Sequence, residues 1–182
     1  YDENGKPIEG LFQDLNGDGD LDVEDKYRYK SPEPKVFLGF SSQFSYMRWS
    51  LAFTLRAQFG NYMYNNFHSN AGNYTSFRFS GYLGNVAANV LETEFEGSDS
   101  RRYWSDYYME NASFLRMDNI NVGYNFGKLT KYLNLRASAT VQNAFIITKY
   151  SGLDPEIAGG IDNNFYPRPR IFSVNLNLDI LN

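Results

Sequence analysis

The sequence contains no cysteine, a single histidine and no apolar run long enough for a membrane-spanning helix. The absence of cysteine excludes disulfides and thiolate chemistry, although it assigns no compartment by itself. The histidine, His68, stands beside Phe67 in a loop-like stretch, where a lone histidine is far more often structural than catalytic. No Ser/His/Asp set, paired-carboxylate motif or phosphate-binding glycine loop accompanies it, so the sequence predicts that the chain is not an enzyme.

An excess of positive charge is also missing. Lysine and arginine total 17 against 21 aspartate and glutamate, a net charge of −4, and this balance indicates no general affinity for nucleic acid. Aromatic residues, by contrast, make up 18% of the chain, more than an ordinary core requires. The 182 residues suffice for one domain with a sizeable core. Because the chain begins at Tyr1 without a signal peptide, we expect a piece of a longer or processed protein.

The most specific motif is an acidic stretch over residues 14–25. Counted from its first residue, carboxylates or amides occupy positions 1, 3, 5, 7, 9 and 12, with Gly19 at position 6. This is the spacing of a calcium-binding loop, in which alternate residues supply oxygen ligands and the glycine allows a sharp turn. The predicted calcium ligands are Asp14, Asn16, Asp18, Asp20 through its backbone carbonyl, Asp22 and Asp25.

Such residues also form solvated turns without metal, but six suitable residues in twelve favour the calcium interpretation. Asp25 stands where a longer glutamate is usual, which predicts modest affinity. We expect a structural ion that rigidifies an extracellular loop. The segment after the loop contains two prolines and leads into a strand instead of a helix.

Alternation of apolar and polar residues predicts five strands. Their expected ranges are 36–46, 49–60, 112–126, 133–142 and 172–180. Strands of about 10–12 residues exceed the soluble mode of about five or six and match the roughly 9–11 that cross a bilayer. The first two form a hairpin around 47–48, and a short helix is expected over 84–91.

Loop length distinguishes a membrane barrel from a soluble sandwich. Long connections (1–34, 61–111, 144–169) alternate with short ones (47–48, 127–131), and outer-membrane barrels likewise have short periplasmic turns and long extracellular loops. The charges of Arg56, Arg136 and Asp179 fall on the polar strand faces. The sequence therefore predicts an all-β, antiparallel transmembrane β-barrel. Residues 1–34 form an extracellular loop with the calcium motif, and 35–182 form barrel strands and loops. Five strands cannot close a barrel, so further strands are expected elsewhere.

A basic and aromatic group stands in the longest connection. Its rings and guanidinium groups can stack on a sugar or peptide, although packing of the loop against the barrel rim or a lid protein is the interpretation we favour. Asp154 and Glu156 flank Pro155 and are expected to be turn residues. The candidate ligand or lid contacts are Arg101, Arg102, Tyr103, Trp104, Tyr107 and Tyr108.

Several stretches occur in one order across nearly the whole chain. They are 14–19, 39–51, 112–124, 142–145, 148–156 and 166–167. Together they resemble the C-terminal end of SusC/RagA-type TonB-dependent outer-membrane transporters of Bacteroidota. The chain departs from the pattern at its end, Ile180-Leu181-Asn182, where an aromatic residue is common.

The resemblance implies a plugged barrel of about 22 strands, of which this chain supplies the last five. It also implies a SusD-like surface lipoprotein as lid, contact with outer-membrane lipid, and energy supplied through TonB. The implied function is import of oligosaccharides or peptides without covalent chemistry. Two alternatives remain: a soluble calcium-stabilised β-sandwich that binds carbohydrate, and an enzyme such as a surface glycosidase, for which no paired carboxylates are found.

Overall fold

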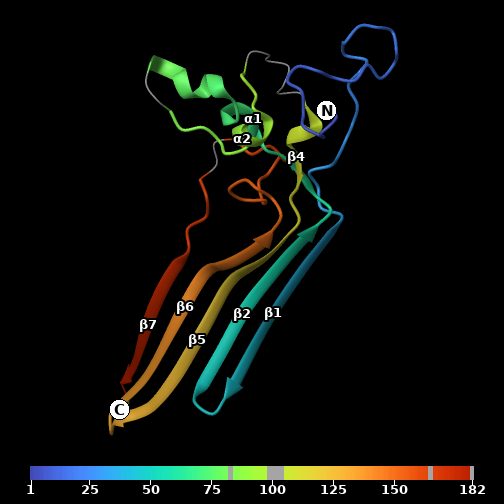
Figure 1. The fold of residues 1–182 in the computed structure, drawn as a ribbon. Coiled ribbons are helices and arrows are strands. Elements are labelled where there is room, and N and C mark those ends of the chain that lie inside the picture. Colours follow the sequence, from blue (N-terminus) through green and yellow to red (C-terminus); the bar gives the residue numbers. More distant parts are fainter. Residues whose placement is uncertain (82–83, 98–104, 164–165, 181–182) are drawn as a thin grey trace. The chain divides into compact units, whose positions relative to one another are not determined.

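The computed structural model describes residues 1–81, 84–97, 105–163 and 166–180. The chain divides into two compact units (Figure 1). The loop unit comprises residues 1–33, 61–112 and 150–166, and the sheet unit comprises 34–60, 113–149 and 167–182. Among the described residues, no helix has the length and apolar character needed to span a membrane.

The sheet unit is one antiparallel sheet of five strands in the order β1-β2-β5-β6-β7. The five predicted strands are thus all present, and the long connections all leave the same end of the sheet. The tight turn at 47–48 closes the β1–β2 hairpin, with Tyr46 opposite Trp49. The strands are β1 Val36–Tyr46, β2 Trp49–Phe59, β5 Phe114–Thr130, β6 Leu133–Thr148 and β7 Ile171–Ile180.

Strands β5 and β6 are longer than predicted, with 17 and 16 residues. The sequence suggested a turn over 127–131, but the ladder continues to Thr130 opposite Leu133. The register shifts on either side of Gly127, whose φ is 77°. Phe126 and Leu129 are the extra residues of two bulges, and Gly127 between them pairs with Leu135. The glycine allows this course inside the hairpin, because it adopts a left-handed conformation without strain.

The sheet has one apolar and one polar face. On β7, Phe172, Val174 and Ile180 are 72%, 77% and 81% exposed, and they alternate with serine, asparagine and aspartate. Large exposed side chains on one face of a long strand are typical of a lipid-facing barrel wall. Besides this sheet, the described residues hold only the two-stranded β3–β4 ladder, β3 Tyr62–Tyr64 and β4 Met109–Asn111. That ladder is too short for the second layer of a sandwich.

A bulge at Asp118 reverses the alternation of β5. Thr54 pairs with Asn119 and the next residue of β2, Leu55, pairs with Met117, so Asp118 is an extra residue. Simple alternation through 112–126 would place Arg116 with the apolar residues. The bulge instead puts it opposite Arg56 on the polar face, because directly paired residues share a face. Asp118 accepts two hydrogen bonds from the Arg56 guanidinium, which offsets the repulsion between the two facing arginines.

The loop unit contains several short elements, whereas the sequence predicted only one short helix in the connection over 61–111. Their core is a cluster of Met63, Ala112 and Tyr150, against which Ile157 packs. Besides β3 and β4, these elements are α1 Asn66–Ala71, η1 Tyr74–Gly81, α2 Val90–Thr93 and η3 Asp106–Tyr108.

The helix expected over 84–91 lies later in the chain, as α2. The amides of Val90 and Leu91, at its start, donate to the carbonyls of Ala87 and Ala88 three residues earlier, so a turn leads into the helix. The helix then ends at Glu94, whose φ is 54° and whose amide donates to the Val90 carbonyl. Burial of Ala87 (3% exposed) and Val90 (1% exposed) fixes the position of the turn and the helix.

Candidate functional site in the loop unit

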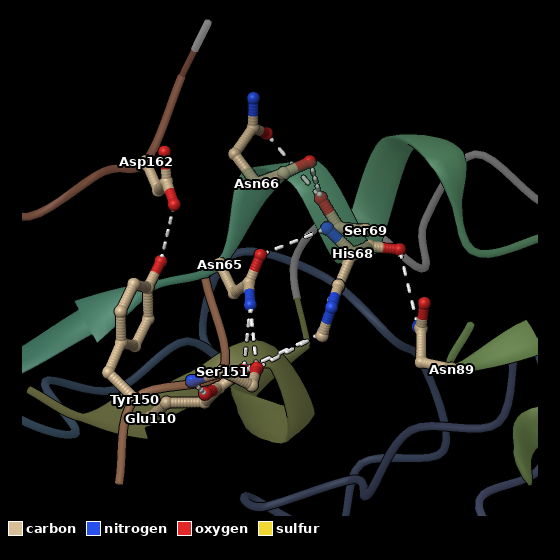
Figure 2. Close-up of polar contacts among 9 residues, drawn as sticks. All are labelled: Asn65, Asn66, His68, Ser69, Asn89, Glu110, Tyr150, Ser151 and Asp162. Atoms are coloured by element: carbon tan, nitrogen blue, oxygen red, sulfur yellow. Dashed lines mark hydrogen bonds and ion pairs between the residues drawn. The ribbon is translucent and has the colours of Figure 1, made fainter. Parts of the chain in front are cut away.

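A polar cluster joins three segments of the loop unit around Asn65 (Figure 2). Asn65 follows β3 and is fully buried (0% exposed). Its side-chain oxygen accepts from the His68 amide at 3.0 Å and caps α1, the usual role of asparagine before a helix. Its amide nitrogen donates to Glu110 at 2.8 Å and to the Ser151 hydroxyl at 3.1 Å. One side chain thus links the helix, β4 and the segment after β6.

Glu110 is the main acceptor of the cluster. Its Oε1 accepts from the Ser151 hydroxyl at 2.7 Å in addition to Asn65, and its Oε2 accepts from the Ser151 backbone amide at 2.8 Å. His68 Nδ1 lies 3.7 Å from the same Oε1. The glutamate and histidine side chains are 24% and 22% exposed. The carboxylate therefore anchors the segment that begins at Tyr150, with an edge that water can reach.

The presence of serine, histidine and glutamate together raises the question of a hydrolytic triad. A triad needs the serine and the carboxylate on opposite ring nitrogens, so that one nitrogen takes the serine proton while the carboxylate holds the N–H of the other and stabilises the imidazolium. Here Ser151 Oγ, at 3.5 Å, and Glu110 both approach Nδ1, and the serine donates directly to the glutamate. This geometry holds a loop in place and does not activate a nucleophile.

A buried tyrosine–aspartate pair holds the same segment further along. The Tyr150 hydroxyl donates to Asp162 Oδ2 at 2.8 Å, and the Asp162 amide donates to the Tyr64 carbonyl. Burial, followed by the hydrogen bond to Asp162, raises the pKa of Tyr150 well above its ordinary value. Gly152 leaves room for this contact, because a Cβ there would lie 2.5 Å from Asp162 Oδ2.

The predicted calcium loop is stabilised by its own side chains. Asp14 accepts from the amides of Gly17 and Gly19 at 2.6 and 2.9 Å, and both glycines have positive φ. Asp25 accepts from the amides of Leu15 and Asp22 at 2.7 and 3.0 Å. The hydrogen bond from Leu15, followed by that from Asp22, lowers the pKa of Asp25.

The remaining predicted ligands form similar local turns. Asn16 accepts from the Asp18 amide, Asp18 from the Asp20 amide, and Asp22 from the Glu24 amide. The donor set suits calcium, because every side chain offers a hard oxygen. Across the described ranges, however, no three His, Cys, Asp or Glu side chains converge closely enough to hold a metal ion. Calcium binding therefore stays a prediction from the residue spacing.

The predicted aromatic contacts are placed only in part. Arg101, Arg102, Tyr103 and Trp104 lie outside the described residues. Tyr108 is 2% exposed, and its ring contacts Tyr64 and Tyr107 at centroid distances of 5.9 and 5.1 Å. The Tyr107 ring also lies 6.3 Å from Phe95, and burial raises the pKa of Tyr107. Both described tyrosines therefore pack within the loop unit.

Little in the sequence indicates the Asn65–Glu110–Ser151 cluster, because its members are 41 to 86 residues apart. The one local signal that could have indicated a member of the cluster is the preference for asparagine immediately before a helix, the position of Asn65. The expected turn at Pro155 is present, since Asp154 accepts from the Glu156 amide at 2.9 Å.

Comparison with known proteins found no matching family model. The TonB-dependent receptor SusC of Bacteroides thetaiotaomicron is 48% identical over 185 residues, which cover 98% of this chain and 18% of that receptor. The TonB-dependent receptor P39 of Formosa agariphila is 27% identical over 191 residues, which cover 93% of this chain and 18% of that receptor. The chain thus spans about a fifth of the length of these relatives.

Solved structures show the same fold. The RagAB peptide transporter matches 88% of this chain with a TM-score of 0.68 and 24% identity, over 19% of its own chain. The open-open state of the RagAB peptide importer matches with a TM-score of 0.67 and 23% identity, over the same shares of the two chains. These named relatives are receptors and importers, which agrees with the predicted absence of enzyme activity. With the single lipid-facing sheet, the comparisons identify this chain as a barrel segment of the SusC/RagA-type family of TonB-dependent outer-membrane receptors.

Proposed function

We propose that this chain contributes barrel strands and extracellular loops to an outer-membrane transporter that imports oligosaccharides or peptides. The observation that carries the proposal is the 48% identity to the receptor SusC across 98% of the chain. The likeness to the RagAB importer supports the same architecture. In this proposal a SusD-like lipoprotein covers the barrel, and TonB supplies the energy.

The test uses the full-length receptor in the outer membrane of its source cell. Labelled oligosaccharides and labelled peptides are offered separately to cells with the receptor, without the receptor, and without TonB. The proposal expects uptake of one class that requires both proteins. Equal uptake in all three strains, with both classes of cargo, would refute it. Purification of the tagged receptor should also recover a surface lipoprotein in equal amount.

The loop unit is the part that we propose to contact cargo or lid. Arg101, Arg102, Tyr103 and Trp104 are the candidates for contact, because the rings of Tyr107 and Tyr108 are occupied by packing. Replacing Tyr103 and Trp104 together by alanine should weaken lipoprotein capture or uptake. A Tyr1→Ala receptor is a suitable control, because Tyr1 is also an exposed aromatic residue of the loop unit (72% exposed).

The calcium loop is proposed as a structural site of modest affinity. The support is the spacing of Asp14 to Asp25 and the hard oxygen donors there. Titration calorimetry of the purified receptor with calcium should show binding at about 10⁻⁴–10⁻³ M, and Asp14→Ala should abolish that signal. Identical titration curves for the two receptors would refute the assignment.

A further inference from the structure

Two Asn-Gly dipeptides occur in the chain, Asn4–Gly5 and Asn16–Gly17, and all four residues are exposed in the loop unit. In such a pair the backbone nitrogen of the glycine can attack the side-chain carbonyl carbon of the asparagine, because no Cβ obstructs the closing ring. This reaction is one reason why asparagine is a thermolabile residue. The groups that surround each pair therefore decide how fast it reacts.

A carboxylate holds the attacking nitrogen of the second pair. The Gly17 amide donates to Asp14 Oδ1 at 2.6 Å, so a base lies on the nitrogen that must lose its proton. In the first pair, the Gly5 amide donates to the backbone carbonyl of Asp2 at 3.0 Å. A peptide carbonyl is a far weaker base than a carboxylate, and the Asp2 carboxylate accepts from other amides. The two pairs thus share their chemistry but differ in the base.

The side-chain amide of Asn16 is held at both of its ends. Its Oδ1, which gains negative charge during attack, accepts from the Asp18 amide at 3.0 Å. A backbone amide aimed at a developing oxyanion stabilises the intermediates of acyl transfer. Its Nδ2, the leaving nitrogen, donates to Asp18 Oδ2 at 2.9 Å and to Glu24 Oε2 at 3.4 Å. A base, an oxyanion donor and partners for the leaving group therefore surround one amide.

We propose that Asn16 is a site of self-catalysed deamidation in which the Asp14 carboxylate acts as the base. The Gly17 nitrogen passes its proton to Asp14 and forms a bond with Asn16 Cγ. The Cγ–Nδ2 bond then breaks, and the leaving nitrogen takes up the proton and departs as ammonia. Water opens the resulting succinimide ring at either carbonyl, which gives aspartate or isoaspartate. Water is the sole co-reactant, so the inference depends neither on bound calcium nor on any cargo.

Either product changes the acidic loop. Both add a carboxylate between those of Asp14 and Asp18, and isoaspartate also lengthens the backbone by one CH₂ group. These changes disturb the hydrogen bonds that shape residues 14–18. An older receptor copy therefore carries a different loop from a newly made one.

The full-length receptor in isolated outer membranes tests this assignment. The membranes are incubated at mildly alkaline pH with a chelator of divalent cations, in water enriched in heavy oxygen, so that conversion during the incubation is labelled. Trypsin digestion follows in ordinary water. Because Pro7 follows Lys6, trypsin leaves both Asn-Gly pairs in one peptide that ends at Lys26. Electron-transfer fragmentation then distinguishes asparagine, aspartate and isoaspartate at each position.

We expect Asn16 to convert on the order of tenfold faster than Asn4, a modest part of the factor of about 10²–10⁴ that a positioned base supplies in enzymes. Since one peptide contains both pairs, differences in recovery cancel. In receptor unfolded by guanidinium chloride, where no carboxylate is positioned, the two rates should converge. Equal rates in the folded receptor, or faster conversion of Asn4, would overturn the proposal.

Substitutions test the base itself. Asp14→Asn keeps an acceptor for the Gly17 amide but removes the base, and it should lower the rate at Asn16 to about that at Asn4. Asp14→Glu keeps a carboxylate and should retain most of the enhancement. Asp2→Asn, the same change beside the first pair, is the matched control and should leave the rate at position 16 unaltered. An undiminished rate in Asp14→Asn, or an equal loss in both Asp14 variants, would refute the role of the carboxylate.

Discussion

Replacing Glu110 by alanine should release the segment after β6 from the rest of the loop unit. The change removes the acceptor of three hydrogen bonds, those from Asn65 Nδ2, the Ser151 hydroxyl and the Ser151 amide. It also leaves the fully buried Asn65 with fewer partners. A buried donor without an acceptor lowers stability further, because its loss of hydration is no longer compensated. The expected effect is local opening while the barrel stays folded.

The magnitude follows from the three contacts. A hydrogen bond to a charged group contributes about 1.5–3 kcal/mol when buried. The Glu110 side chain is 24% exposed, so water replaces part of each lost bond. We therefore expect a total loss of about 2–4 kcal/mol in the free energy of local opening, which is a rise of about 30- to 700-fold in the opening equilibrium.

Hydrogen exchange of the full-length receptor, read by mass spectrometry, measures this opening. Peptides that cover 61–66 and 150–152 should exchange faster in Glu110→Ala, whereas peptides from β2 and β5 should not change. Glu110→Gln, which keeps an acceptor of the same size, should show a smaller effect. Glu33→Ala, at an exposed glutamate of the loop unit, is the matched control. Equal exchange at 150–152 in Glu110→Ala and Glu33→Ala would refute the anchoring role.

Three further changes have defined outcomes. Asp118→Ala removes the carboxylate that accepts two hydrogen bonds from Arg56, opposite Arg116. It should cost on the order of 2 kcal/mol, visible as a lower temperature for the heat-dependent gel shift; an unchanged temperature would contradict this. Gly123→Ala places a Cβ 2.4 Å from Ser50 Oγ and should cost about 1–3 kcal/mol by overpacking, with recovery in the double variant that also carries Ser50→Gly. The raised pKa of Tyr150 means that its stabilising effect is fully present below the unfolded tyrosine pKa of about 10 and is lost as pH rises through the folded pKa. Protection at 150–152, that is, exchange corrected for the base-catalysed intrinsic rate at each pH, should therefore fall at alkaline pH in wild type. Tyr150→Phe should show lower protection at neutral pH and no such alkaline fall.

Sequence reasoning succeeded where the pattern is local. Strict alternation located β1, β2 and β7 to within a residue or two, because a face against lipid must be apolar at every second position. It failed where a bulge adds a residue without ending the strand, at Asp118 and beside Gly127 in β5 and between Gln142 and Phe145 in β6. Nothing in the alternation distinguishes a bulge from the end of a strand, so β5 and β6 were predicted too short.

The loop unit was less predictable for a different reason. Its polar cluster depends on contacts between residues as distant as Asn65 and Ser151, and no spacing rule relates such positions. A lone loop histidine has no partner that the sequence can indicate, and the structure places His68 at the edge of the Glu110 anchor. In the acidic loop over 14–25 the contacts are local and the spacing is regular. The spacing predicts carboxylates that point toward a common ion, whereas in the structure they mostly accept hydrogen bonds from nearby backbone amides.

The extra residue at Asp118 has a consequence for how such a chain can change through evolution. A deletion of Asp118 removes the bulge but leaves every flanking residue on its present face, because Met117 and Asn119 already face opposite ways. A residue inserted here that no bulge absorbs would instead turn Arg116 from the polar face toward the lipid, at a cost of about 2–4 kcal/mol for a charge at mid-membrane, and would turn Leu115 and Met117 inward with it. The strand near this point should therefore lose a residue far more readily than it gains one, whereas in the long connections a residue more or less changes no face.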